Sequence, residues 1–182
     1  MKAKSIKGKS TEEIQTALAD SMQDGFNPTL AIVFTSIKQN WKEIVSLLDK
    51  QSIQIFGSTT SGEFIDGEIG EGSIAVMLLD INPSFFKILF EETGDQTSLE
   101  NAKKVGTAGK NIFSNPAFII ASGWLQIDGE QIVEGIEAGF GGEPTIFGGM
   151  AGDDLALTAP LVFTNEKSSV NGLLALIIDE DK

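Results

Sequence analysis

The sequence predicts an α/β fold, with helices and strands in layers (α+β layered) around a mixed β-sheet core. Three observations support this class. Segments with helix-start signals alternate along the chain with apolar, β-branched segments. Several apolar segments are continuous rather than alternating, which is typical of strands covered on both faces. The order of the segments also occurs twice, which predicts two related halves.

Four segments begin with the spacing of a capping box, in which the cap side chain lies three residues before an acid or amide. Each is followed by apolar residues at helical spacing. We expect the first helix to stop at Gly25 and the fourth near Gly139. The four cap pairs are Ser10 with Glu13, Asn40 with Glu43, Thr97 with Glu100, and Asp128 with Gln131.

Apolar, β-branched runs separate these helices and are the expected strands. They are long enough for strands but far shorter than the ~20 residues that span a bilayer. The runs are Leu30–Thr35, Ile53–Phe56, Ile74–Leu79, Phe85–Phe90, Ala117–Ala121, Thr145–Phe147, Leu161–Phe163 and Leu173–Ile178.

The chain resembles itself at a separation of about ninety residues. Pro28 and Pro116 each precede a strand and lie 88 residues apart. Farther on, Ile55-Phe56-Gly57-Ser58 corresponds to Ile146-Phe147-Gly148-Gly149, at a separation of 91 residues. We therefore expect one domain over residues 1–182, made of two helix-strand-helix-strand-strand repeats. Their expected bounds are about 10–92 and 97–180.

Composition excludes several kinds of chemistry. The chain has no Cys and no His, so it has no thiolate nucleophile, no Ser-His-Asp triad and no His or thiolate ligand for haem. Its 26 acidic and 13 basic residues give a net charge of −13, which disfavours binding to nucleic acid or to an anionic membrane. The N-terminal lysines precede no apolar segment of a signal peptide, and we expect a cytoplasmic protein without a cofactor.

Two equivalent turns are the strongest candidates for a ligand site. Each directly follows an expected strand, and ligands of α/β proteins bind beyond the carboxyl ends of strands. Turn formation alone would also favour Gly, Ser and Asp there. The first turn contributes Ser58, Thr59, Thr60, Ser61 and Glu63, and the second contributes Gly149, Met150, Gly152, Asp153 and Asp154.

If the halves are related by a pseudo-twofold axis, the two turns face each other across one cleft. Such a cleft suits a small polar ligand, with Glu63 and Asp153 holding its cationic group. Hydroxyl groups of the first turn and backbone N–H groups of the second would hold its anionic end. Trp124, on the loop after Ala117–Ala121, either stacks on the ligand or packs over the sheet edge.

A carboxylate-based enzyme is the alternative. Glu63 paired with Asp153 or Asp154 could serve a hydrolase or lyase, with or without Mg²⁺ or Ca²⁺. No recognisable catalytic constellation accompanies these carboxylates. We therefore expect no catalytic residues, no resident metal and no enzymatic activity.

The two turn segments resemble motifs of the N-terminal FIST domain (F-box and intracellular signal transduction proteins). The first motif is Phe56-Gly57-Ser58-Thr59-Thr60-Ser61-Gly62-Glu63, and the second is Gly148-Gly149-Met150-Ala151-Gly152-Asp153. Their order and spacing fit over nearly the whole chain. The resemblance implies a sensory domain of signalling proteins that binds small molecules such as amino acids, without catalysis.

The resemblance also implies partners. FIST N-terminal domains are usually followed by a C-terminal FIST partner domain and are often joined to signalling output modules. This sequence stops at Lys182, so we expect that partner to be absent here. A third reading is a pure interaction module, whose exposed apolar surface would meet that partner or form a homodimer.

Overall fold

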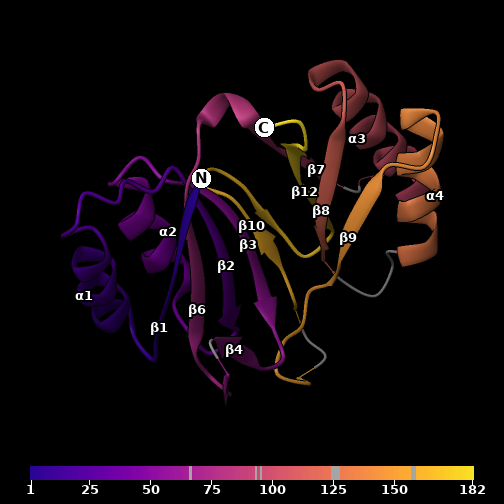
Figure 1. Ribbon diagram of the computed structural model, residues 1–182. Coiled ribbons are helices and arrows are strands. Elements are labelled where there is room, and N and C mark those ends of the chain that lie inside the picture. The colour runs from indigo at the N-terminus through magenta and orange to yellow at the C-terminus, as the bar shows by residue number, and fades with distance from the viewer. Residues whose placement is uncertain (66, 93, 95, 124–127, 157–158) are drawn as a thin grey trace.

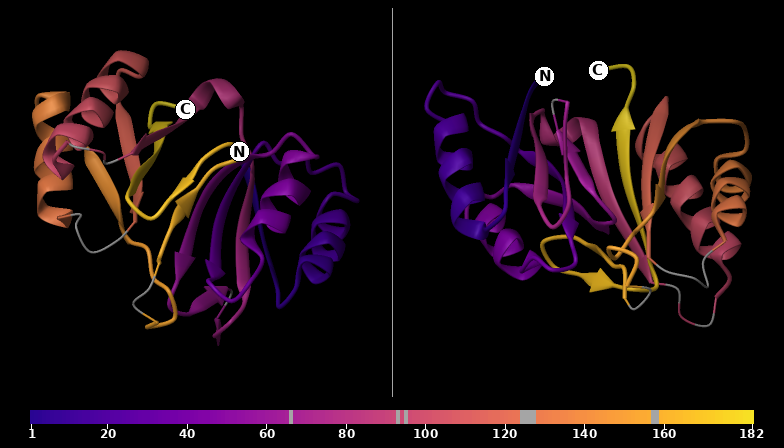
Figure 2. Two further views of the ribbon diagram at one scale, coloured as in Figure 1. Left: turned by 180° about the vertical axis from the view of Figure 1, so that it is seen from behind. Right: turned by 90° about the horizontal axis from the view of Figure 1, so that it is seen from below.

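Four layers make up the fold in the computed structural model (Figure 1). A pair of helices covers the outer face of one sheet, a second pair covers the outer face of another, and the two inner faces pack together. Figure 2 shows the same layers from behind and from below. The predicted α/β class with a mixed β-sheet core is confirmed. The structure describes residues 1–65, 67–92, 94, 96–123, 128–156 and 159–182.

The predicted helices and strands are present within the described residues. The helices are α1 (Thr11–Ser21), α2 (Trp41–Asp49), α3 (Ser98–Ile112) and α4 (Gly129–Phe140), with a short 3-10 turn η1 (Pro83–Phe85). The strands are β1 (Lys2–Gly8), β2 (Leu30–Ser36), β3 (Gln54–Thr60), β4 (Glu63–Ile65), β5 (Glu68–Gly70), β6 (Ile74–Asp80), β7 (Phe86–Glu92), β8 (Pro116–Ser122), β9 (Thr145–Met150), β10 (Val162–Phe163), β11 (Ser168–Ser169) and β12 (Gly172–Asp179).

Both large sheets contain the same four-strand unit. In the first sheet the order is β1-β6-β2-β3, and in the second it is β7-β12-β8-β9. In each unit the last two strands are parallel and the other neighbours are antiparallel. The shared topology is consistent with the internal duplication that the sequence indicates.

Because of strands β1 and β7, the two four-strand units have different bounds from the repeats predicted from the sequence. Lys2–Gly8 is absent from the expected strands because its alternating lysines resemble a basic tail, yet Ile6 is buried and the segment pairs with β6. Exposed lysines on such an edge strand also protect it from pairing with other chains. The run Phe85–Phe90, counted above with the first half, pairs with β12 in the second sheet. The units are therefore strand-helix-strand-helix-strand-strand.

The connectors from β3 to β6 in the first unit and from β9 to β12 in the second differ in where they pair. In the first unit, the connector forms the separate hairpin β4–β5. In the second, it forms the hairpin β10–β11, which crosses to the other sheet and pairs antiparallel with β3. Phe163 of β10 is fully buried there and stacks on Trp41, with ring centroids 5.2 Å apart. One half thus completes the sheet and core of the other.

Helices α3 and α4 pack backbone to backbone. A Cβ added to Gly106 would lie 2.1 Å from the carbonyl oxygen of Ile136, and one added to Gly139 would lie 2.1 Å from that of Lys103. Gly139 therefore belongs to the helix interface, and the predicted helix end there is wrong. The cap is Gly141, whose left-handed conformation (φ 82°) is one that glycine adopts without strain.

Candidate functional site

Parts of both predicted turns are strand. Gly57, Ser58, Thr59 and Thr60 belong to β3, and Gly148–Met150 belongs to β9. Small and hydroxyl residues predict a turn locally, but here they fit a crowded central strand. A Cβ on Gly57 would lie 2.2 Å from the ring of Phe163, so glycine allows that ring to pack flat on β3.

The segments that follow the two strands meet directly. The N–H of Gly152 donates to the carbonyl of Thr59 at 2.9 Å, and the N–H of Asp154 donates to that of Thr60 at 3.4 Å. A Cβ on Gly152 would lie 2.5 Å from the hydroxyl of Ser61. The structure brings the two segments together, and backbone hydrogen bonds join them at this contact.

Glu63 lies at the start of β4 with its carboxylate turned into the protein. Oε1 accepts a bond from the Thr60 hydroxyl at 2.8 Å, and Oε2 accepts bonds from the Ser73 N–H and hydroxyl, both at 2.9 Å. The residue is only 3% exposed. Glu63 therefore fastens the end of β3 to the start of β6, and among the described residues no lysine pairs with it.

Replacing Glu63 by alanine should lower the free energy of unfolding by about 2 to 3 kcal/mol, because two buried donors of Ser73 and the partly buried Thr60 hydroxyl would lose their acceptor. Glu63→Gln should cost less than about 1 kcal/mol, since its oxygen can accept both Ser73 bonds and its amide can donate to Thr60. Urea denaturation of the two variants measures the difference. Equal losses for alanine and glutamine would contradict this structural role.

Asp153 and Asp154 hold two different parts of the structure in place. Asp153 is 3% exposed and accepts a bond from the N–H of Ala159 at 3.2 Å. Asp154 accepts a 2.5 Å bond from the Ser36 hydroxyl and forms an ion pair with Lys38 at 3.4 Å. Because Ser36 ends β2, Asp154 ties the connector of the second half to the first sheet.

The other candidate residues fall into different environments. Ser58 and Thr59 are buried, and the Thr59 hydroxyl accepts a bond from the N–H of Leu161 at 2.9 Å. Ser61 is exposed, and Met150 lies on β9 with its sulfur 2.8 Å from the Ser122 hydroxyl. Gly149 faces open space. Trp124 lies outside the described residues.

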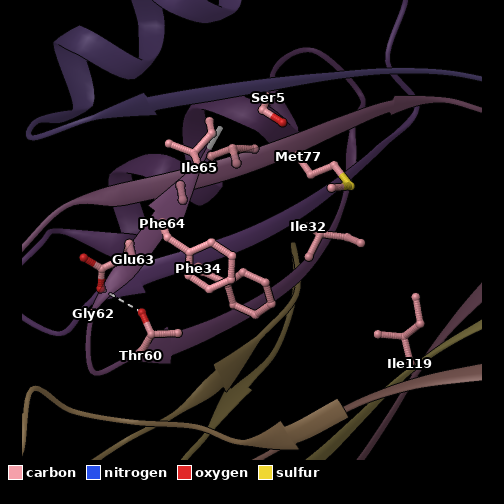
Figure 3. Close-up of a pocket in the computed structure, with 12 residues that line it drawn as sticks. Ser5, Ile32, Phe34, Thr60, Gly62, Glu63, Phe64, Ile65, Met77 and Ile119 are labelled. Atoms are coloured by element: carbon pink, nitrogen blue, oxygen red, sulfur yellow. Dashed lines mark hydrogen bonds between the residues drawn. The ribbon is translucent and has the colours of Figure 1, made fainter. Parts of the chain in front are cut away.

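A groove of about 600 Å³ lies between the inner face of the first sheet and strand β8 of the second (Figure 3). Its polar end contains Thr60 and Glu63, so two of the predicted residues belong to it. The rest of the lining is largely apolar, and Phe34 and Met77 are 40% and 46% exposed there. The principal apolar residues are Ile32, Phe34, Phe64, Ile65, Met77 and Ile119.

These apolar residues are absent from the candidates named from the sequence. The period-two pattern of β2 does place Ile32 and Phe34 on one face. That pattern cannot tell which part of the face the second sheet covers. The groove exists because the sheets meet around Leu30, Phe56 and Leu176 and leave the adjoining surface open.

Within the described residues, no group of three or more Asp or Glu side chains is placed to hold a metal ion. Nor does any described helix combine the length and apolarity needed to cross a membrane.

Comparison with known proteins identifies the family. A search of curated proteins found no match to this chain. The family model of the FIST N domain matches residues 29–182, which covers everything from just before β2 to the end of the chain. Both motif segments and the groove between the sheets lie within the match, apart from Ser5. The protein therefore belongs to the FIST N domain family, a family of sensory domains in signal transduction.

Proposed function

We propose that this sensory domain binds a small amphipathic molecule, such as an apolar amino acid or amine, in the groove between the sheets. The single observation that supports this proposal best is the groove itself. Its volume of about 600 Å³ is in the range of small-molecule sites, and its lining combines apolar walls with a few polar groups at one end.

The lining indicates how such a ligand would lie. Phe34, Met77 and Ile119 offer an apolar surface for the body of the ligand. Thr60 and Glu63 lie together at the polar end, where Figure 3 shows the hydrogen bond between them. A carboxylate next to a hydroxyl favours a cationic or hydrogen-bond-donating head group. The apolar walls favour a ligand with a larger apolar part than the sequence alone indicates.

The position of the groove also suggests how binding could signal. Phe34 and Met77 belong to the first sheet, whereas Ile119 belongs to the second. A ligand that contacts both sheets would favour the arrangement in which they lie at the right separation. Such a difference in affinity between two arrangements shifts their populations, which an attached module can detect.

A thermal-shift screen of the purified chain tests this function. Leucine, phenylalanine, methionine and their decarboxylated amines should raise the unfolding temperature, whereas serine and aspartate should not. A ligand at a hundredfold excess over its Kd adds about 2.7 kcal/mol to the free energy of unfolding. Phe34→Lys, which places an ammonium group among the apolar walls, should abolish the shift. Ile69→Lys is the matched control, because Ile69 is 89% exposed and lies outside the groove.

Glu63→Gln separates the head-group contact from the structural role of this residue. The variant should lose less than about 1 kcal/mol of stability but bind amines at least about tenfold more weakly, because it removes the negative charge and keeps the hydrogen bonds. Unchanged amine binding would overturn the role of Glu63. If no amine or amino acid shifts the wild-type chain, the ligand proposal is wrong. A shift with Mg²⁺ together with hydrolysis would favour the carboxylate enzyme instead.

A further inference from the structure

The duplicated units differ at one sheet edge. In the first unit, β3 is covered by β10, which pairs with it antiparallel at Gly57 and Ser58. The equivalent strand of the second unit is β9, and among the described residues it pairs with β8 alone. The edge of β9 therefore corresponds to a position that is occupied in the other half of the same molecule.

Backbone groups on this edge point outward. The N–H of Ala151 donates to the carbonyl of Ser122 on β8, so the alternation of a strand turns the N–H groups of Ile146, Gly148 and Met150 away from β8. In the first unit, the equivalent N–H groups of Ile55 and Thr59 donate to Asn165 and to Leu161. The three on β9 bond to no described residue.

Side chains show the same difference. Phe56 of β3 and Phe147 of β9 occupy equivalent positions in the repeat. Phe56 is 1% exposed, whereas Phe147 is 61% exposed. Met150, farther along β9, is 48% exposed. An uncharged edge strand with large exposed apolar side chains readily pairs with another strand.

Helix α4 runs beside this edge and forms a second wall (Figure 1). A groove of about 220 Å³ lies between the two elements. Ile132 and Val133 line it from the helix, and Ile146 and Met150 line it from β9. Val133 is 41% exposed. A strand added to β9 would direct every second side chain into this apolar groove, as in other complexes in which a peptide extends a sheet.

The charged residues of α4 favour a partner strand that carries basic side chains. The helix carries three glutamates and no basic residue. Glu130 and Glu137 lie three residues before and four residues after Val133, which places both beside it on the helix surface. Neither carboxylate is bonded to another described residue. The whole chain carries a net charge of −13, so a second copy would be repelled and a basic partner attracted.

We propose that β9 and α4 form a docking site for an extended, basic segment of a partner protein. The segment pairs antiparallel with β9, as β10 does with β3. Alternate apolar side chains enter the groove beside Val133, and lysine or arginine side chains lie near Glu130 and Glu137. This site is separate from the small-molecule groove between the sheets and does not depend on it.

A labelled peptide tests the proposal on the full chain. The probe is fluorescein-labelled Lys-Lys-Thr-Val-Thr-Val-Thr-Lys-Lys, which has alternating apolar residues and basic ends, and its binding is followed by fluorescence anisotropy. The same peptide with N-methyl groups on the alternate residues whose N–H groups would face β9 keeps its charge but cannot donate the strand hydrogen bonds. It should bind at least about tenfold more weakly.

Two protein variants locate the contact. Val133→Lys should weaken binding of the probe at least about tenfold, whereas Ile112→Lys, at a position equally exposed (41%) on α3, should leave it unchanged. Equal binding of the N-methylated peptide, or no effect of Val133→Lys, would overturn the proposal. If the chain instead self-associates and Met150→Pro abolishes that association, the occupant is a second copy and the basic partner is wrong. The N-methylated peptide keeps the test valid even if one variant folds poorly.

Discussion

Replacing Phe56 by alanine should lower the free energy of unfolding by about 3 to 5 kcal/mol. Phe56 is 1% exposed and belongs to the cluster between the two sheets, so its loss leaves a cavity between the halves. Its equivalent in the repeat, Phe147, is 61% exposed. Phe147→Ala should therefore cost less than about 0.5 kcal/mol. Urea denaturation followed by circular dichroism measures both.

This pair of variants is a matched comparison, because the same substitution is made at equivalent positions of two similar strands. A large loss for Phe147→Ala would mean that its ring is buried in solution, by a partner copy or by movement of the sheets. In that case β9 would not present an exposed apolar ring at this position, and one of the observations behind the proposed docking site would be wrong.

Gly106→Ala should destabilise the protein by about 2 kcal/mol or more, although alanine is the better helix former. The added Cβ would lie 2.1 Å from the carbonyl oxygen of Ile136 and 2.9 Å from the backbone nitrogen of Phe140. Both atoms belong to the backbone of α4, so α3 and α4 must move apart. Thermal and urea denaturation should show the loss.

Gly129→Ala is the control for this substitution. Gly129 is in α4, and a Cβ there would have no atom within 4 Å apart from its chain neighbours and the adjacent backbone of its own helix. The variant should stay within about 1 kcal/mol of the wild type, with any change favourable. Equal losses at the two positions would show that the helix contact is not responsible, because the effect of Gly→Ala on the unfolded chain is stabilising.

The helices could be predicted from the sequence because their start signals are local. The side chains of Ser10, Thr97 and Asp128 each accept a bond from a backbone N–H in the first turn of their helix. Asn40 differs, since its side chain donates to Glu43 at 2.7 Å and caps no N–H group. Capping spacing thus located all four helix starts even where the cap bond is missing.

Sheet membership could not be predicted, because it depends on contacts between distant parts of the chain. Nothing near Phe163 indicates that its ring fits on Gly57, more than a hundred residues away. In the same way, the small and acidic residues of the FIST motifs are visible in the sequence, but their roles are not. Glu63 and Asp154 are candidate ligand-binding residues by their chemistry, but nothing in the sequence indicates that their oxygens also hold β3, β6 and β2 in place.

The crossing of β10 has a consequence for synthesis of the protein. The ribosome makes β3 long before Val162 and Phe163, which pair with it. Until that segment emerges, the edge of β3 that faces away from β2 stays unpaired, and Trp41 lacks the ring on which it stacks. The N-terminal half therefore cannot finish folding as a separate unit, as an independent domain would. The two halves reach their native state together, late in translation.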